Sequence, residues 1–128
     1  MVTEDYVSFE TAKLLKEKGF DEFCRAFYVK SKEMGIEFFI STNNKNYNSP
    51  SVPATSAPTL QMAMKWLREE HNLYIDPYPE DNNTWCLIIW KLYPKRVIQC
   101  DGKYDDYSYS TYEKGCEAAI KYCLENLI

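Results

Sequence analysis

The chain carries its strongest strand signal at residues 85–93, which read Trp-Cys-Leu-Ile-Ile-Trp-Lys-Leu-Tyr. Aromatic and β-branched residues of this kind are enriched in strands. The apolar character is nearly continuous, and this predicts a central strand that is covered on both faces. The longest fully apolar run, residues 86–90, is far shorter than the roughly 20 residues of a membrane-spanning helix.

Two further extended segments flank this strand. Residues 73–76 precede it and are separated from it by the turn-forming sequence 79–83. Residues 94–95, Pro-Lys, end the strand, and residues 96–100 return antiparallel to it. Short connections of this kind predict an antiparallel sheet.

One helix is expected before these three strands in the sequence, and another is expected after them. The first covers residues 60–71, begins after a capping Thr59 and has apolar residues three, four and seven positions apart. The second begins at Ser110-Thr-Tyr-Glu113, which matches the capping-box pattern, and continues nearly to the C-terminus. Its expected inner face consists of Tyr112, Cys116, Ala119, Ile120, Cys123 and Leu127.

The N-terminal part predicts one more helix and a hairpin. Ser8 has the side chain of a helix N-cap, and Gly19 is the residue type that commonly ends a helix in the left-handed conformation. Residues 24–30 and 36–41 are rich in aromatic and branched residues, and residues 31–35 have the length of a hairpin loop.

Residues 43–58 form a polar connection that contains three prolines and lacks periodicity. It is longer than most loops in compact domains, so we expect it to be mobile, functional or a hinge. The predicted fold class is α+β, with an antiparallel sheet of four or five strands and three helices packed mainly on one face. We expect one domain over residues 1–128, within which 1–42 and 59–128 could be subdomains joined by the connection.

The charge balance disfavours two classes of partner. The net charge is −4 and the isoelectric point is about 5.0, whereas proteins that bind a phosphate backbone usually have a basic patch. Generic nucleic-acid binding and polybasic membrane attachment are therefore disfavoured. The N-terminal residues lack the basic and apolar regions of a secretory signal, and together with unpaired cysteines this predicts a cytoplasmic location.

No residue pattern supports catalysis, a cofactor or a metal. His71 is the only histidine, and its place at the end of a predicted helix favours a half-exposed imidazole with a positive charge. The five cysteines, at positions 24, 86, 100, 116 and 123, do not form pairs with the two-to-four-residue spacing of zinc ligands. The four glycines are not spaced as in a phosphate-binding loop. We expect no catalytic, cofactor-binding or metal-binding residues.

Tyrosine supplies 11 residues of the chain, and its amphipathic ring suits the edge of a core or a surface that contacts a partner. The sequence 103–109 is both acidic and tyrosine-rich. It could be a solvated loop whose rings pack against the domain, or part of a contact surface. The candidate interaction residues are Tyr47, Tyr104, Asp105, Tyr107 and Tyr109.

Three classes of function stay open. The tyrosine content and the missing catalytic motifs favour a non-enzymatic module that binds another protein. The α-β-β-β-α order of residues 59–128 is also the order of double-stranded-RNA-binding domains, although the third helix lacks clustered lysines at its start. The third class is a small-molecule enzyme with a pocket beside Trp66 and the connection.

Three helical stretches together resemble a group of small uncharacterised proteins from gut anaerobes, often encoded in prophages or mobile elements. The stretches are residues 8–22, 57–69 and 110–126. The resemblance implies a bacterial or phage setting, and it carries no catalytic residues over because the group has no known function. The strands and the tyrosine-rich segment depart from it most.

Overall fold

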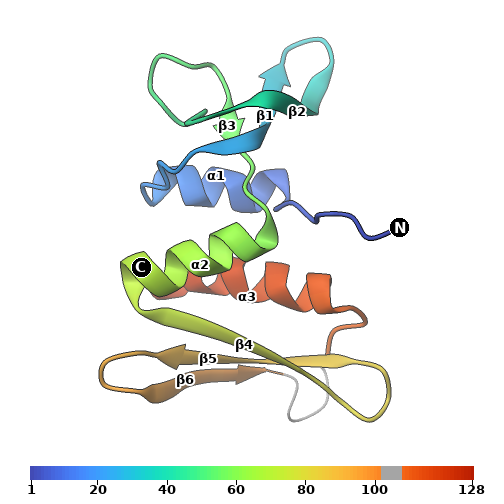
Figure 1. Cartoon of the computed structure of the whole chain (residues 1–128), viewed down its shortest axis with the longest axis vertical. Helices are drawn as coiled ribbons and strands as arrows, with labels where there is room; N and C mark the ends of the chain where they lie inside the picture. The colour runs from blue at the N-terminus through green and yellow to red at the C-terminus, as the bar shows by residue number, and fades with distance from the viewer. Residues whose placement is uncertain (102–107) are drawn as a thin grey trace. The chain divides into compact units, whose positions relative to one another are not determined.

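The computed structural model describes residues 1–101 and 108–128, and its elements are labelled in Figure 1. The described residues form an α+β structure, as predicted, with three helices and six strands. In chain order they are α1 (Phe9–Glu17), β1 (Cys24–Ser31), β2 (Gly35–Lys45), β3 (Thr55–Ser56), α2 (Leu60–His71), β4 (Leu73–Pro79), β5 (Trp85–Lys91), β6 (Arg96–Asp101) and α3 (Tyr112–Asn126).

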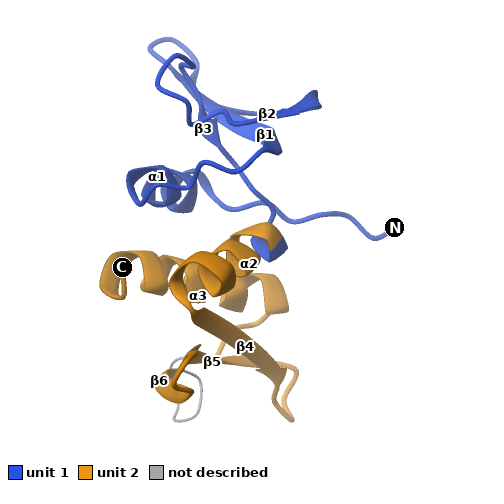
Figure 2. Cartoon of the chain, turned by 60° about the vertical axis from the view of Figure 1, so that its left-hand side comes forward, with its two compact units in different colours: residues 1–61 blue, residues 62–128 orange. Residues whose placement is uncertain are grey.

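The chain divides into two compact units, residues 1–61 and 62–128, which Figure 2 shows in blue and orange. Each unit contains one antiparallel three-stranded sheet, in the order β2-β1-β3 in unit 1 and β4-β5-β6 in unit 2. The prediction of a single sheet with four or five strands is therefore wrong. Apolar periodicity indicates strands but not their partners, and β1 pairs with β3, which the sequence does not indicate as a strand. The prediction of one domain stays a prediction.

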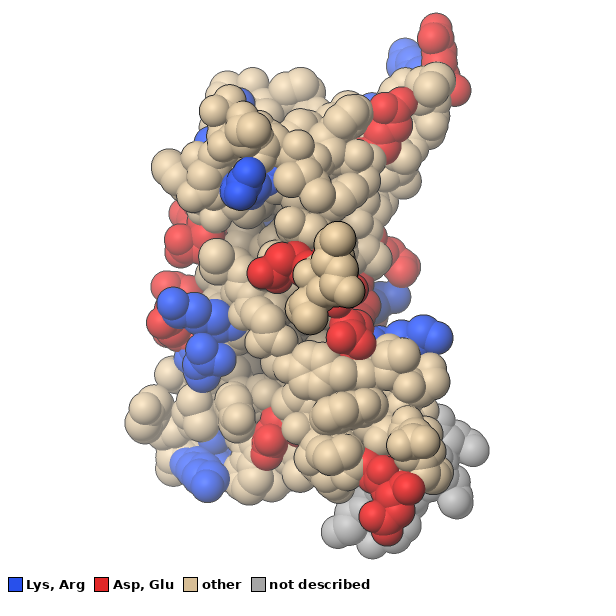
Figure 3. All heavy atoms as spheres, turned by 45° about the vertical axis from the view of Figure 1, so that its right-hand side comes forward, with Lys and Arg blue, Asp and Glu red and all other residues tan. Residues whose placement is uncertain are grey.

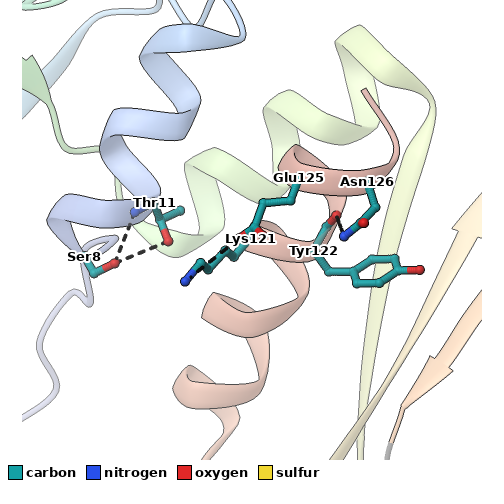
Figure 4. Close-up of polar contacts among 6 residues, drawn as sticks. All are labelled: Ser8, Thr11, Lys121, Tyr122, Glu125 and Asn126. Atoms are coloured by element: carbon teal, nitrogen blue, oxygen red, sulfur yellow. Dashed lines mark hydrogen bonds and ion pairs between the residues drawn. The ribbon is translucent and has the colours of Figure 1, made fainter.

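Helix α1 begins and ends at the residues that the sequence indicates. Ser8 Oγ accepts a hydrogen bond from the Thr11 N–H over 3.3 Å, which Figure 4 shows. Gly19 has a φ of +92°, and the Phe20 N–H donates to Leu15 C=O over 2.9 Å. This bond reaches back across the last turn to a carbonyl that also accepts a longer bond, of 3.2 Å, from the Lys18 N–H.

The polar connection 43–58 belongs to unit 1 and is hydrogen-bonded to other parts of it. Asn48 joins two parts of this unit, because its Nδ2 donates to Phe20 C=O over 2.8 Å and its Oδ1 accepts from the Ser56 N–H over 2.9 Å. Ser56 is itself buried, and its Oγ accepts from the Tyr47 N–H over 3.0 Å. The segment lacks periodicity because these side-chain bonds, rather than a helix or a long strand, satisfy its backbone.

Unit 2 is built on β5, which is the central strand of its sheet, as predicted. Leu87 and Ile89 are buried on one face of the sheet. Ile88 and Trp90, on the opposite face, are only partly buried. The prediction that both faces of β5 are covered is therefore confirmed for one face only.

Helix α3 lies against this sheet and brings its backbone close to β5. A Cβ atom placed on Gly115 would lie 2.5 Å from Leu87 Cδ2, so a glycine permits the observed approach. The N-cap is Thr111, whose Oγ1 accepts from the Lys114 N–H over 3.1 Å, one residue later than the predicted Ser110. Further along the helix, Lys121 and Glu125 form an ion pair and Asn126 donates to Tyr122 C=O (Figure 4).

We expect Asn48→Ala to destabilise unit 1 by about 2 kcal/mol, because it removes the partners of Phe20 C=O and the Ser56 N–H. Hydrogen exchange of the amides in residues 1–61 measures this loss. Asn44→Ala is the matched control, since Asn44 is an exposed asparagine of the same part of the chain. Equal loss of protection in the two variants would contradict the structural role of Asn48.

We expect Gly115→Ala to destabilise unit 2 in the wild-type chain and to do so less, by about 1 kcal/mol, when Leu87 is replaced by Val. Valine lacks the Cδ2 atom that the new methyl group meets, while the gain in helix propensity is the same in both backgrounds. Urea unfolding followed by tryptophan fluorescence measures both effects, because all three tryptophans lie in unit 2. An identical effect in both backgrounds would rule out the contact.

Candidate interaction surface

Strand β2 forms one edge of the sheet in unit 1, with β1 on its inner side (Figure 1). Its regular part pairs with β1 up to Ile40, which lies opposite Ala26, and the register then becomes irregular. Beyond this point Ser41 C=O accepts from Arg25 Nε over 3.2 Å, and Ser41 Oγ accepts from the Asn43 N–H over 2.9 Å. The part of β2 available for further pairing is therefore the segment before Ser41.

The backbone of β1 determines which residues of β2 point away from the sheet. Residues of a central strand alternate between bonding one neighbour and bonding the other. The Ala57 N–H donates to Ala26 C=O over 2.9 Å, so even-numbered residues of β1 bond toward β3 and odd-numbered residues toward β2. The register places Phe27 opposite Phe39, so odd-numbered residues of β2 bond to β1. The N–H and C=O groups that point outward belong to Ile36, Phe38 and Ile40, which we call the β2 edge.

The side chains of the β2 edge are exposed as well as apolar. The exposed fractions are 47% for Ile36, 41% for Phe38 and 58% for Ile40. Phe39, on the other face of the strand, is 42% exposed. Single exposed apolar residues are ordinary, but a contiguous row on one strand is typical of an interaction site.

Aromatic contacts fix this strand in place. The ring centroid of Phe38 lies 5.2 Å from that of Tyr28 and 5.4 Å from that of Tyr6. On the opposite face, the Phe27 ring stacks on Phe39 at 5.5 Å and on Tyr47 at 4.3 Å. Such ring pairs contribute about 0.5–1.5 kcal/mol beyond burial, so they stabilise the position of the strand that carries the β2 edge.

Two of the other edge strands, β3 and β4, carry features that discourage pairing. Strand β3 has two residues, and edge strand β4 contains Pro77 and Pro79, which lack the N–H that a ladder needs. Strand β2 is 11 residues long and contains no proline. Among these three strands, β2 alone lacks protection against pairing.

The outer face of the sheet in unit 2 is a second aromatic surface. Tyr74 and Trp90 are cross-strand partners there, and Asp76 follows on the same face of β4. Trp90 Nε1 donates to Asp76 Oδ2 over 3.2 Å, and Lys95 Nζ lies 4.8 Å from the centroid of a Trp90 ring. The polar groups of this face are thus bonded to one another, whereas the backbone groups of the β2 edge point outward.

Of the predicted interaction residues, the structure describes two, Tyr47 in unit 1 and Tyr109 in unit 2. Tyr104, Asp105 and Tyr107 lie outside the described part of the chain. Tyr109 is partly buried and exchanges two backbone bonds with Trp85, of 2.7 and 2.9 Å. Tyr47 is 3% exposed and its hydroxyl donates to Asn43 C=O, so its ring forms part of the core of unit 1.

Sequence reasoning missed the β2 edge. The available signal was the sequence Ile36-Glu-Phe-Phe-Ile40, in which both faces of one strand are apolar. A three-stranded sheet with one helix packed against it has too little structure to cover both faces. The predicted hairpin of residues 24–30 and 36–41 is confirmed by β1 and β2, but the exposure of the apolar residues of β2 was not predicted.

Burial shifts the pKa of four groups that could act as nucleophiles or bases, three thiols and one imidazole. Burial raises the pKa of Cys24, that of Cys116 to about 11 and that of Cys123 to about 12. Burial lowers the pKa of His71, whose ring packs edge-on against Trp66 at 4.7 Å. The lowered pKa opposes the positive charge that was expected at this helix end, and Lys91 Nζ also donates to His71 C=O over 3.4 Å.

Neither a metal-binding cluster nor a membrane-spanning helix occurs in the described residues. No three His, Cys, Asp or Glu side chains of residues 1–101 and 108–128 lie together in a way that could hold a metal ion. Within the same residues, no helix is both long enough and apolar enough to cross a bilayer.

We expect the free energy of unfolding of unit 2 to fall as the pH rises from 9 toward 12. The thiols of Cys116 and Cys123 ionise near pH 9.0 when unfolded but only near 11 and 12 when folded. The unfolded chain therefore binds fewer protons in this range, and stability that is complete below pH 9 is lost above it. Urea unfolding under reducing conditions should show a flatter decline for Cys116→Ala/Cys123→Ala than for wild type. The same slope in both proteins would contradict the raised pKa values.

The chain was compared with protein-family models, with curated proteins and with solved structures, and none of the three comparisons finds a match.

Proposed function

We propose that this protein is a non-enzymatic interaction module that binds an extended polypeptide segment at the β2 edge. The observation that carries the proposal is the outward direction of the backbone groups of Ile36, Phe38 and Ile40, combined with the exposure of their side chains. Addition of a strand to an exposed edge is a common mode of peptide recognition, in which backbone bonds supply affinity.

Alternate side chains of the partner would supply specificity. Ile36, Phe38 and Ile40 lie on the same face of β2 because they are two residues apart. A partner strand that places branched or aromatic residues on this face would pack against them, and such cross-strand pairs each contribute about 0.2–1 kcal/mol. The preferred partner is therefore a segment with apolar residues at alternate positions.

Nucleic-acid binding has less support as the alternative. Unit 2 has the α-β-β-β-α order and an antiparallel β4-β5-β6 sheet, as expected for the double-stranded-RNA-binding topology. However, residues 62–128 contain 8 Lys and Arg against 11 Asp and Glu. On the face in Figure 3, basic and acidic side chains alternate in small groups separated by uncharged surface. Phosphate binding requires a basic footprint, so this balance favours a protein partner.

The wider setting is also part of the proposal. A bacterial or phage mobile element and a cytoplasmic location were both expected from the sequence, and both stay predictions. An exposed, uncharged strand edge suits either setting, because strand addition needs only backbone groups and alternating side chains from the partner.

We expect the β2 edge to bind a generic strand peptide, acetyl-Lys-Thr-Val-Thr-Val-Thr-Val-Thr-Lys-amide. Titration of the isotope-labelled chain should shift the amide signals of Ile36, Phe38 and Ile40 most. Ile40→Lys should weaken binding about tenfold, which corresponds to about 1.4 kcal/mol, by placing a charge on the contact face.

Thr42→Lys is the matched control for this titration, because it adds the same charge to exposed β2 residues beyond the regular ladder. Its affinity should stay within twofold of wild type. Shifts that avoid the β2 edge, or equal weakening by both variants, would overturn the proposed function.

A further inference from the structure

The sequence of the β2 edge reads the same in both directions. Its outward positions carry Ile, Phe and Ile, so they are symmetric about Phe38. Two-fold symmetric association requires a surface that complements itself, with each residue meeting its counterpart by rotation. A second copy of β2, placed antiparallel, brings Ile36 opposite Ile40 of that copy and Phe38 opposite Phe38.

We infer that the occupant of the β2 edge is a second copy of this chain, paired antiparallel about a two-fold axis at Phe38. This inference rests on the proposed function, since it names the strand that the edge accepts. The two copies form one six-stranded antiparallel sheet in the order β3-β1-β2-β2-β1-β3, which satisfies the outward backbone groups of both copies.

The alternative registers are disfavoured by charge and geometry. An axis at Glu37 places two carboxylates directly opposite each other, which is destabilising. An axis at Phe39 pairs Ile36 with Thr42, in the irregular segment where Ser41 and Asn43 bond to each other. The axis at Phe38 places Glu37 opposite Phe39 and keeps every outward pair within the regular ladder.

The second copy suits the edge better than an unrelated strand does. The partner must supply apolar residues at alternate positions together with its own unpaired backbone groups, and β2 supplies both. Strand β3 is too short for this role, and the prolines of β4 remove the donors that pairing would use. A single strand pair is a small interface, so we expect a dissociation constant in the micromolar range, about 1–100 μM.

Sedimentation velocity from 5 to 500 μM tests the inference on the full chain. Wild type should shift from monomer to dimer over this range. Phe38→Lys alone and Phe38→Glu alone should each stay monomeric, because like charges meet at the axis, whereas their equimolar mixture should form a heterodimer. Thr42→Lys and Thr42→Glu are the matched pair away from the axis, and each should dimerise like wild type.

Disulfide trapping tests the register without charges at Phe38, which also contacts Tyr6 and Tyr28. Opposed residues in a hydrogen-bonded pair have Cα atoms about 5.5 Å apart, within reach of a disulfide. Ile36→Cys and Ile40→Cys should not cross-link alone, but their mixture should yield a heterodimer. Wild type under the same oxidation is the control, and circular dichroism confirms the fold of each variant.

Two results would overturn the inference. One is a wild-type chain that stays monomeric at 500 μM, and the other is cross-linking of Ile36→Cys or Ile40→Cys alone in place of the mixture. The strand-peptide titration separates these failures from failure of the proposed function. A monomer whose Ile36, Phe38 and Ile40 amides still respond to the peptide retains the proposed function but not the second copy as partner.

Discussion

The direction in which the backbone groups of β2 point depends on one constraint, the pairing of β3 with β1 through the bond from the Ala57 N–H to Ala26 C=O. A central strand has two sides, and this bond assigns the even-numbered residues of β1 to β3. The odd-numbered residues are then left for β2, and the outward groups of β2 follow by alternation. A shift of β3 by one residue along β1 would reverse the assignment. Phe39, in place of Phe38, would then present its backbone to solvent.

The register of β3 depends on side chains of the connection that precedes it. Asn48 bonds to Ser56 on one side and to Phe20, at the end of α1, on the other. Tyr47 bonds to Ser56 Oγ and stacks on Phe27 of β1. A segment without helix or strand periodicity therefore holds the two-residue strand in register. Its polar side chains supply these bonds.

Local signals in the sequence were sufficient to predict the helices and the longer strands. The caps of α1 act within a few residues of Ser8 and Gly19, so the sequence alone locates them. The N-cap of α3 is Thr111 and not the predicted Ser110, and the sequence could not distinguish them because both side chains have the same capping chemistry. Strand partners and the role of the connection depend on contacts between distant residues, such as Asn48 with Phe20, and no local pattern encodes them.

The candidate site on β2 was not among the residues that the sequence pattern indicated. Tyrosine is typical of contact surfaces, yet Tyr47 is buried because its ring completes a stack within unit 1. The apolar residues of β2 resemble core residues, and only the sheet order reveals that no further strand of unit 1 covers them. Composition reports what a side chain can do, whereas exposure depends on how much structure surrounds it.

Pairing through the β2 edge has a natural limit in this fold. An exposed strand that accepts another strand on each side extends into a fibre, because every addition leaves a new edge. Here the pairing uses the one long unprotected edge of unit 1, and the opposite edge is the two-residue β3. The irregular segment after Ile40 also ends the ladder, since Ser41 C=O is already bonded to Arg25. Two-fold pairing at Phe38 thus covers the β2 edge of both copies, and no β2 edge is left for a third copy.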